Sequence, residues 1–286
     1  MKLAVNFSQA LLSLFAEDPD LPVDFVKVPT IPFPECFSQF EQGRVYRELL
    51  PHPAQPGVIS LGAPSPKEQF NPELVTKIID QTNPPYLSTH LEAELDFFPE
   101  FKNEQHHFHP ELKKALLERF LTGIDRVKNA TGLPLVLENF PFYSWGHHYK
   151  LGSDPSFITQ VCEAGDCSFL LDIAHARCSA WNFGVSVEKY LESLPLSRMA
   201  EIHLAGVSLR VEGVRDTHTK LDEEDYQLLE FILDQTTPGI VTIEYGGLPD
   251  RIINFDQEWE PIRRNEPQEL KEMIYRVLSV LGVKVG

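Results

Sequence analysis

The sequence predicts an α/β fold in which eight parallel strands close into a barrel surrounded by helices. Short, apolar runs alternate with longer segments of helical periodicity. Eight such runs can be counted, and one helical segment closes the chain after the eighth. Apolar strands are typical of parallel sheets covered on both faces, and the count of eight favours a closed barrel over an open doubly wound sheet. We therefore expect the 286 residues, 1–286, to form a single barrel domain.

The expected strands are the short apolar runs. In chain order they are Leu3–Ser8, Asp24–Pro29, Gly57–Ala63, Tyr86–Glu92, Pro134–Phe140, Ser168–Ala176, Met199–Gly206 and Gly239–Gly247. The beginning of the chain is interpreted as a first strand that leads into a helix rather than as a signal peptide. Asn6, Ser8 and Gln9 interrupt its apolar residues, and no small-residue cleavage site follows.

Helical periodicity and helix-end signals place helices between these runs. Pro110 suits a first helical turn and Gly132 a C-terminal cap, whereas Asp154 can cap the helix that ends at Gly165. Further helices are expected at residues 72–82, 186–194, 222–235 and 266–282. Residues 99–109 and 248–265 are polar, and we expect added loops there.

Composition excludes several classes of protein. A formal net charge of −17 repels phosphate backbones, which argues against nucleic-acid binding. No run approaches the roughly 20 apolar residues of a membrane helix. The four cysteines are too few and too scattered for a disulfide framework, so we expect reduced thiols and a cytoplasmic protein. They are Cys36, Cys162, Cys167 and Cys178.

Chemically active side chains gather at the expected carboxyl ends of the strands, which is where barrels of this kind carry their active sites. Five consecutive strands end in a carboxylate or an imidazole. These residues, from the fourth strand to the eighth, are His90, Glu138 with Asn139, Asp172 with His175, His203 with Asp216 and His218 behind it, and Glu244.

Such a set predicts a metal centre. Four carboxylates converging in an apolar barrel mouth would repel one another unless a cation neutralised them. Imidazole together with carboxylate suits iron, zinc or manganese rather than calcium. Each residue alone has a plainer interpretation: Asp172 as a turn cap, for example, or Asp216 and His218 as a solvated loop pair. The prediction therefore depends on the whole constellation. His147 and His148, in the loop after the fifth strand, are expected at the surface or in a lid, within possible reach of a substrate.

At this point the motifs resemble a known family. "LENFPFY", "FLLDIAHARCSAWNFG", "EIHLAG" with the following "DTH", and "IEYGG" are similar to the multinuclear non-heme iron-dependent oxidative enzymes, relatives of the oxidase of methanobactin biosynthesis. The resemblance covers most of the chain and is strongest from residue 134 to 247. It implies a xylose isomerase-like TIM barrel with two or three iron ions. It also implies a dioxygen-dependent oxidoreductase of natural-product biosynthesis that modifies cysteine-containing peptides, usually presented by a partner protein.

The ligand order is also similar to that of endonuclease IV-type phosphodiesterases and xylose isomerase-like barrels. By that resemblance Glu138, Asp172, His203 and Glu244 form one site, His175, Asp216 and His218 form a second, and His90 with bridging Glu138 forms a third. These families carry a histidine on the third strand, whereas Gly62 stands nearest that place here. Val207 likewise stands where the oxidative family often has histidine. We therefore expect two well-occupied iron ions and at most a weak third site at His90.

Three functions compete. The first is an iron oxygenase acting on a peptide or small thiol, in which Glu138, Asp172, His203 and Asp216 are catalytic and Asn139 helps to hold the cofactor. The second is a zinc- or manganese-dependent hydrolase or sugar isomerase with the same ligands, and the third is a binding module that has lost catalysis. The sequence HLAG and the acidic composition favour the first over a phosphodiesterase. The near-complete ligand set argues against the third.

Overall fold

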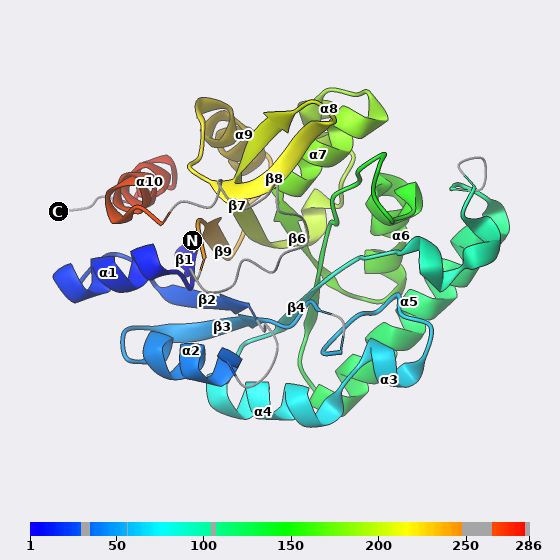
Figure 1. Cartoon of the computed structure of the whole chain (residues 1–286), viewed down its shortest axis with the longest axis horizontal. Helices are drawn as coiled ribbons and strands as arrows, with labels where there is room; N and C mark the ends of the chain where they lie inside the picture. Colours follow the sequence, from blue (N-terminus) through cyan, green and yellow to red (C-terminus); the bar gives the residue numbers. More distant parts are fainter. Residues whose placement is uncertain (30–34, 56, 104–106, 248–264, 284–286) are drawn as a thin grey trace.

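Eight parallel strands form a nearly closed barrel in the computed structural model, which describes residues 1–29, 35–55, 57–103, 107–247 and 265–283. Neighbouring strands follow the order β3-β2-β1-β9-β7-β6-β5-β4, with the helices around the outside (Figure 1). The parallel strands are β1 (Lys2–Asn6), β2 (Phe25–Pro29), β3 (Glu48–His52), β4 (Leu87–His90), β5 (Leu135–Glu138), β6 (Ser168–Asp172), β7 (Met199–Arg210) and β9 (Ile240–Glu244). The predicted barrel is thereby confirmed.

A ninth strand lies outside the barrel. β8 (Gly213–Thr219) pairs antiparallel with the second half of β7, so the two form a hairpin that extends beyond the barrel mouth (Figure 1). The helices are α1 (Gln9–Glu17), α2 (Glu35–Arg44), α3 (Pro66–Gln69), α4 (Pro72–Thr82), α5 (Pro110–Thr131), α6 (Pro155–Ala164), α7 (Ile173–Phe183), α8 (Val187–Glu192), α9 (Glu223–Leu233) and α10 (Pro267–Val280). None of the helices in the described ranges is both long and apolar enough to cross a membrane.

The third strand was predicted in the wrong place. Residues 57–63 form a loop in which Ile59 makes only an isolated bridge to Phe70, and β3 lies earlier, at Glu48–His52. Gly62 packs closely in that loop: an added Cβ would lie 2.4 Å from the carbonyl oxygen of Glu92. The real strand has only two residues of apolar run before Pro51, so its pattern is weak.

The position of Pro51 is explained by the barrel seam. β3 and β4 stand at the two ends of the strand order and lie next to each other. No backbone pairing joins them within the described residues, and this unpaired junction is the seam. A proline lacks the N–H that a central strand must donate, but an outer strand tolerates it. Side chains connect the two strands instead, since His52 Nδ1 lies 2.8 Å from Ser88 Oγ.

Other predictions differ less from the structure. The sixth strand was expected to continue to Ala176 but ends at Asp172, where α7 begins. The expected helix boundaries at Pro110, Gly132 and Asp154 are confirmed. The expected loop at 248–265 lies outside the described residues apart from its last residue.

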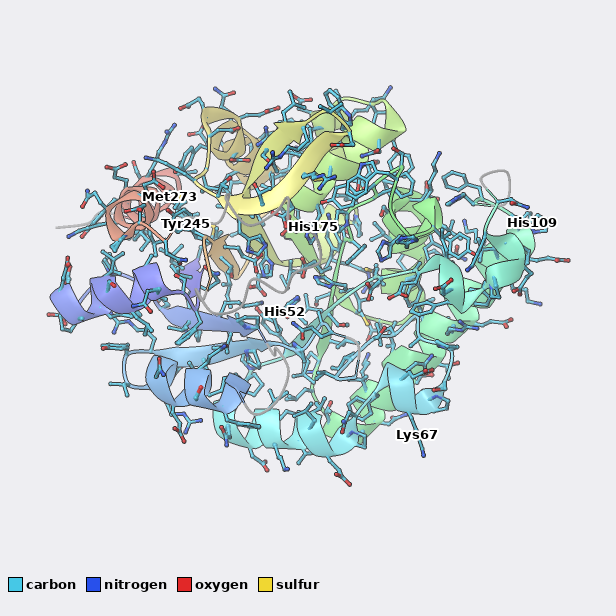
Figure 2. All side chains as sticks on the ribbon, viewed as in Figure 1. His52, Lys67, His109, His175, Tyr245 and Met273 are labelled. Carbon is cyan, nitrogen blue, oxygen red and sulfur yellow. The ribbon has the colours of Figure 1, made fainter. Side chains whose placement is uncertain are left out.

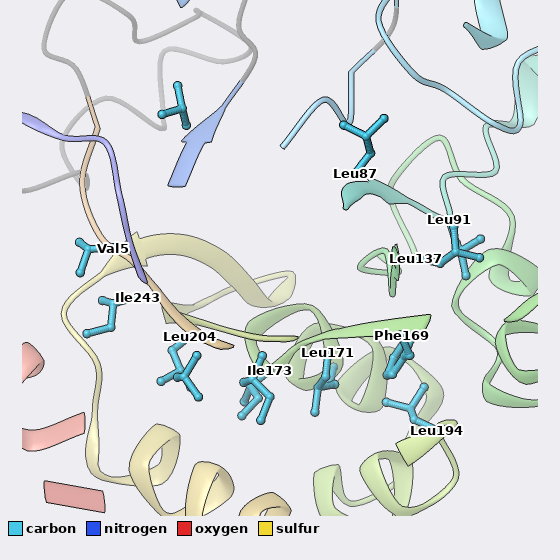
Figure 3. Close-up of a cluster of buried hydrophobic side chains, with 14 of the residues drawn as sticks. Val5, Leu87, Leu91, Leu137, Phe169, Leu171, Ile173, Leu194, Leu204 and Ile243 are labelled. Carbon is cyan, nitrogen blue, oxygen red and sulfur yellow. The ribbon is translucent and has the colours of Figure 1, made fainter. Parts of the chain in front are cut away.

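The barrel strands are apolar on the side that faces the helices. Leu137, Leu171, Leu204 and Ile243 are almost completely buried, and Leu171 and Leu204 lie between the strands and the helices (Figure 3). Burial of each such side chain contributes about 1.5–3 kcal/mol. Successive residues of a strand point to opposite faces. Each of the three leucines has a polar neighbour in the chain that therefore points into the barrel: Glu138, Asp172 and His203, respectively.

Candidate metal centre

The spacing between Asp172 and His175 follows from the way β6 turns into α7. Asp172 is the N-cap residue of the helix, and its Oδ1 accepts the backbone N–H of His175 at 2.7 Å. This bond satisfies one of the N–H groups that have no partner inside a helix. It also leaves His175 Nε2 3.9 Å from the second carboxylate oxygen, Oδ2. The turn thus provides an imidazole and a carboxylate side by side.

Asn139 braces these two residues from β5. Its side-chain oxygen accepts the Asp172 N–H at 2.8 Å, and its amide nitrogen donates to the Asp172 carbonyl at 3.0 Å. Its backbone carbonyl lies 2.8 Å from His175 Nδ1, which directs the other ring nitrogen towards the barrel mouth. The Asn139 side chain is thus engaged with the backbone of Asp172, and its part in holding a cofactor stays a prediction.

His203 faces Asp172 from the adjacent strand, in register with it. Its Nδ1 lies 4.0 Å from Asp172 Oδ2 and 3.3 Å from Glu244 Oε1. Its Nε2 lies 3.1 Å from Glu201 Oε1. An ionised carboxylate oxygen only accepts hydrogen bonds, so Nε2 carries a proton and Nδ1 is the nitrogen available to a cation.

A β-bulge in the hairpin redirects His218. Val207 pairs with Asp216, but the next pair is Gly206 with Thr219, so β8 carries extra residues at this point. His218 has φ +49°, in the left-handed region, which histidine enters more readily than most residues other than glycine. Bulges bend a strand and change the aim of its side chains. The bulge thus sets the direction of the His218 side chain.

The predicted convergence of Asp216 and His218 is nevertheless observed. His218 Nε2 lies 3.2 Å from Asp216 Oδ2 and 3.5 Å from Glu244 Oε2. His175 Nε2 lies 3.6 Å from the same Asp216 oxygen. Thr217, between them, donates instead to the carbonyl of Gly206. The hairpin thus brings the Asp216 carboxylate and the His218 imidazole close to His175.

His52 is a donor that was not predicted from the sequence. It ends β3, and its Nε2 lies 3.3 Å from Glu138 Oε2 and 3.3 Å from His90 Nε2. Figure 2 shows His52 and His175 towards the middle of the barrel. The premise that the third strand offers no histidine was wrong, because the strand itself was misplaced. The available signal was a histidine directly after the short Leu-Leu-Pro segment. In the structure His52 pairs with Pro29, at the end of β2.

Three groups of donor atoms overlap in the mouth. Each contains three side chains whose ligand atoms lie within 4.8 Å of one another. The groups are His52 with His90 and Glu138, Glu138 with Asp172 and His175, and Asp172 with His203 and Glu244. Glu138 and Asp172 each belong to two groups, and a carboxylate with two oxygens can bridge two cations.

Proton affinities reflect the crowding of these groups. Burial, followed by the nearby Asp216, Glu138 and Glu244 carboxylates, raises the pKa of Asp172 to about 7, although His175 opposes this. Burial acts to lower the pKa of His203, but Glu244, Glu138 and Glu201 raise it to about 9. Protons thus occupy positions that a cation could take.

The buried atoms in the mouth fit a metal. Among the described residues, Asp172 Oδ2 and His203 Nδ1 are buried without a hydrogen-bond partner. A buried polar atom left unpaired costs about 1–3 kcal/mol. A cation between them would satisfy both, and the mixture of imidazole and carboxylate suits iron, zinc or manganese.

Other histidines lie outside this centre. His109 caps α5 by accepting the Glu111 N–H, far from the mouth in Figure 2. His148 lies at the rim, with Nε2 3.3 Å from Glu92 Oε1 and its ring against Phe140. Phe140 also contacts the rings of His90 and His175, and so forms an apolar wall beside the centre.

Solved structures share the fold at low sequence identity. A D-tagatose 3-epimerase-like protein has a TM-score of 0.59 at 16% identity over 99% of both chains. A putative xylose isomerase from Rhodospirillum rubrum has a TM-score of 0.57 at 14% identity over 100% of both chains. These likenesses confirm the xylose isomerase-like TIM barrel.

Curated relatives bear only a general name. A UPF0276 protein of Vibrio vulnificus is 29% identical over 200 residues, which is 66% of this chain and 66% of the relative. A UPF0276 protein of Paraburkholderia phytofirmans is 43% identical over 95 residues, 33% of this chain and 31% of the relative. The matched regions thus span between about a third and about two thirds of these relatives.

The family comparison covers much more of the chain. A model described as "RiPP precursor modification enzyme MbnB/TglH/ChrH" matches residues 11–264. This range includes every side chain of the three overlapping donor groups. The chain therefore belongs to the MbnB/TglH/ChrH family of RiPP precursor modification enzymes.

Proposed function

We propose that the protein is a multinuclear iron enzyme that uses dioxygen to modify a cysteine-containing peptide in natural-product biosynthesis. The observation that carries this proposal is the sharing of Glu138 and Asp172 between adjacent donor groups. Shared carboxylates suit neighbouring cations better than isolated ones. Membership of a family that modifies peptide precursors supports a peptide substrate.

The metal count in this proposal is revised from the sequence-based expectation of two. His52 supplies the third-strand imidazole, so the group with His90 and Glu138 has three donors. The second predicted set, His175 with Asp216 and His218, also stands together. We therefore propose three iron positions in the mouth.

The side chains hold and shield such ions. Asp172 and His175 are fixed by a helix cap, and Phe140 limits access of water on one side. When bound, iron supplies the electron-transfer chemistry with dioxygen that no protein side chain here provides. Imidazole and carboxylate ligands on rigid strands hold the ions at fixed separations, which a reaction between dioxygen and a thiol requires.

The test is a mass-spectrometric assay of co-expressed peptide. The chain is produced anaerobically together with a panel of small cysteine-containing peptides, with and without candidate partner proteins, and then exposed to dioxygen. We expect a mass change in one peptide that requires iron and is lost when the peptide cysteine is replaced by serine. Asp172→Ala, which removes a shared carboxylate, should abolish it. Full modification by iron-free protein would refute the proposal.

The alternative, a zinc- or manganese-dependent hydrolase or sugar isomerase, is supported by the same donor atoms and by the xylose isomerase-like fold. It differs in one requirement, because such reactions need no dioxygen. Turnover of a sugar or a phosphodiester by anaerobic, manganese- or zinc-loaded protein would favour this alternative.

A further inference from the structure

Beneath the metal centre, the barrel interior contains a buried charged network that the proposed reaction does not use. Lys27 on β2 is 1% exposed and Glu201 on β7 is 0% exposed. Lys27 Nζ lies 2.8 and 2.9 Å from the two carboxylate oxygens of Glu201. Tyr86 donates to Oε2 of Glu201 at 2.8 Å, and Thr242 donates to Oε1 at 2.6 Å.

This network is expensive to bury, so stability alone does not account for it. Taking two charges out of water costs several kcal/mol for each ion, and well-packed apolar residues of similar size often replace such a pair without loss. A glutamate here also adds negative charge beneath the carboxylates of the mouth. Some other requirement must explain Lys27 and Glu201.

The contact between Glu201 and His203 indicates that requirement. The two residues are two apart on β7, so both side chains point into the barrel, with Glu201 one layer deeper. Glu201 Oε1 lies 3.1 Å from His203 Nε2 and is held by Lys27 and Thr242. An imidazole can bind a metal through either nitrogen, and the hydrogen bond of the other nitrogen decides which one is available.

Resting on the metal centre proposed above, we infer that Glu201 is a positioning residue. It holds the proton on His203 Nε2, so that Nδ1 faces Asp172 and Glu244, while Lys27 neutralises the carboxylate and fixes its orientation. Lys27 also lies 3.4 Å from Ser88 Oγ, which is 2.8 Å from His52 Nδ1. The same buried lysine thus supports a histidine in each of two donor groups.

Two charge-neutral double variants test this inference without leaving a buried charge unpaired. Lys27→Met with Glu201→Gln keeps an oxygen that can accept the His203 N–H, whereas Lys27→Met with Glu201→Met removes it. Both should fold, and thermal unfolding of the metal-free proteins checks this. In Zn²⁺ titrations, the Met/Met variant should bind about 10–100-fold more weakly at one site, the range found when the hydrogen-bond partner of a ligand is removed. At that site, the one that contains His203, the Met/Gln variant should stay close to wild type.

Nuclear magnetic resonance of ¹⁵N-histidine protein loaded with Zn²⁺ gives a readout that packing alone would not change. We expect a slowly exchanging Nε2–H proton from His203 in wild type and in the Met/Gln variant, and its loss or rapid exchange in the Met/Met variant. Equal Zn²⁺ affinity and an unchanged Nε2–H signal in both doubles would overturn the inference. Failure of wild type to bind metal would instead remove the proposed function, so the two failures are distinguishable.

Discussion

Replacing His52 by alanine tests the donor group that the sequence analysis missed. A complete four-ligand zinc site contributes about 10–16 kcal/mol, which is roughly 3 kcal/mol for each ligand. Loss of His52 leaves only His90 and Glu138 in its group, so affinity at that position should fall about 100-fold. When iron is supplied at the level that fills the wild-type positions, the variant should retain two of three iron equivalents.

The structural cost of His52→Ala should be small by comparison. The lost hydrogen bond to Ser88 is worth about 0.5–1.5 kcal/mol, and a domain of this size loses roughly 2–4 °C in Tm per kcal/mol. Iron analysis after anaerobic reconstitution and thermal unfolding separate the two effects. His109→Ala is the control, because this histidine caps α5 and should leave the iron content unchanged. Two equivalents in both wild type and His52→Ala would refute a third position and leave His52 as a structural hydrogen-bond partner of Ser88.

Three further outcomes are expected. His218→Ala should lose about one metal equivalent while circular dichroism shows a folded barrel, and unchanged metal content would make Asp216 and His218 a surface pair. Gly206→Ala should destabilise the hairpin by about 1–3 kcal/mol and lower metal content, because its Cβ would lie 2.5 Å from two backbone oxygens. Gly239→Ala, whose Cβ would meet only one atom at 3.4 Å, is the matched control. Zn²⁺ affinity, measured by chelator competition, should fall as the pH falls, because the metal must displace protons from His203 below about pH 9 and from Asp172 below about pH 7. Each displaced proton contributes about tenfold per pH unit, so affinity should drop at least about 100-fold from pH 8 to 6, and a flat profile would contradict this.

The predictable part of the site comes from strands with long apolar runs. β5, β6 and β9 have such runs, and Glu138, Asp172 and Glu244 lie at their carboxyl ends, as predicted. His203 lies on β7 as predicted but does not end it, because β7 continues to Arg210 and pairs with β8. Residues on these strands are strongly constrained by the helices packed outside them. The alternation of outward leucine and inward polar residue is therefore visible in the sequence.

The unpredicted part depends on contacts between distant segments. β3 is short and contains Pro51, which only its position at the seam accommodates, so periodicity favoured the later apolar run at 57–63. The bulge at His218 is likewise set by pairing with β7 rather than by local sequence. The partnership of Lys27 with Glu201 joins residues far apart in the chain, and no local pattern indicates it.

The most direct test of the proposed centre is anomalous X-ray diffraction, at the iron absorption edge, from crystals of anaerobically iron-loaded protein. We expect strong peaks in the barrel mouth, one beside Asp172 Oδ2 and His203 Nδ1 and another beside His52 and His90. Absence of any peak in the mouth, or peaks confined to the rim at Glu92, Glu94 and His148, would contradict it.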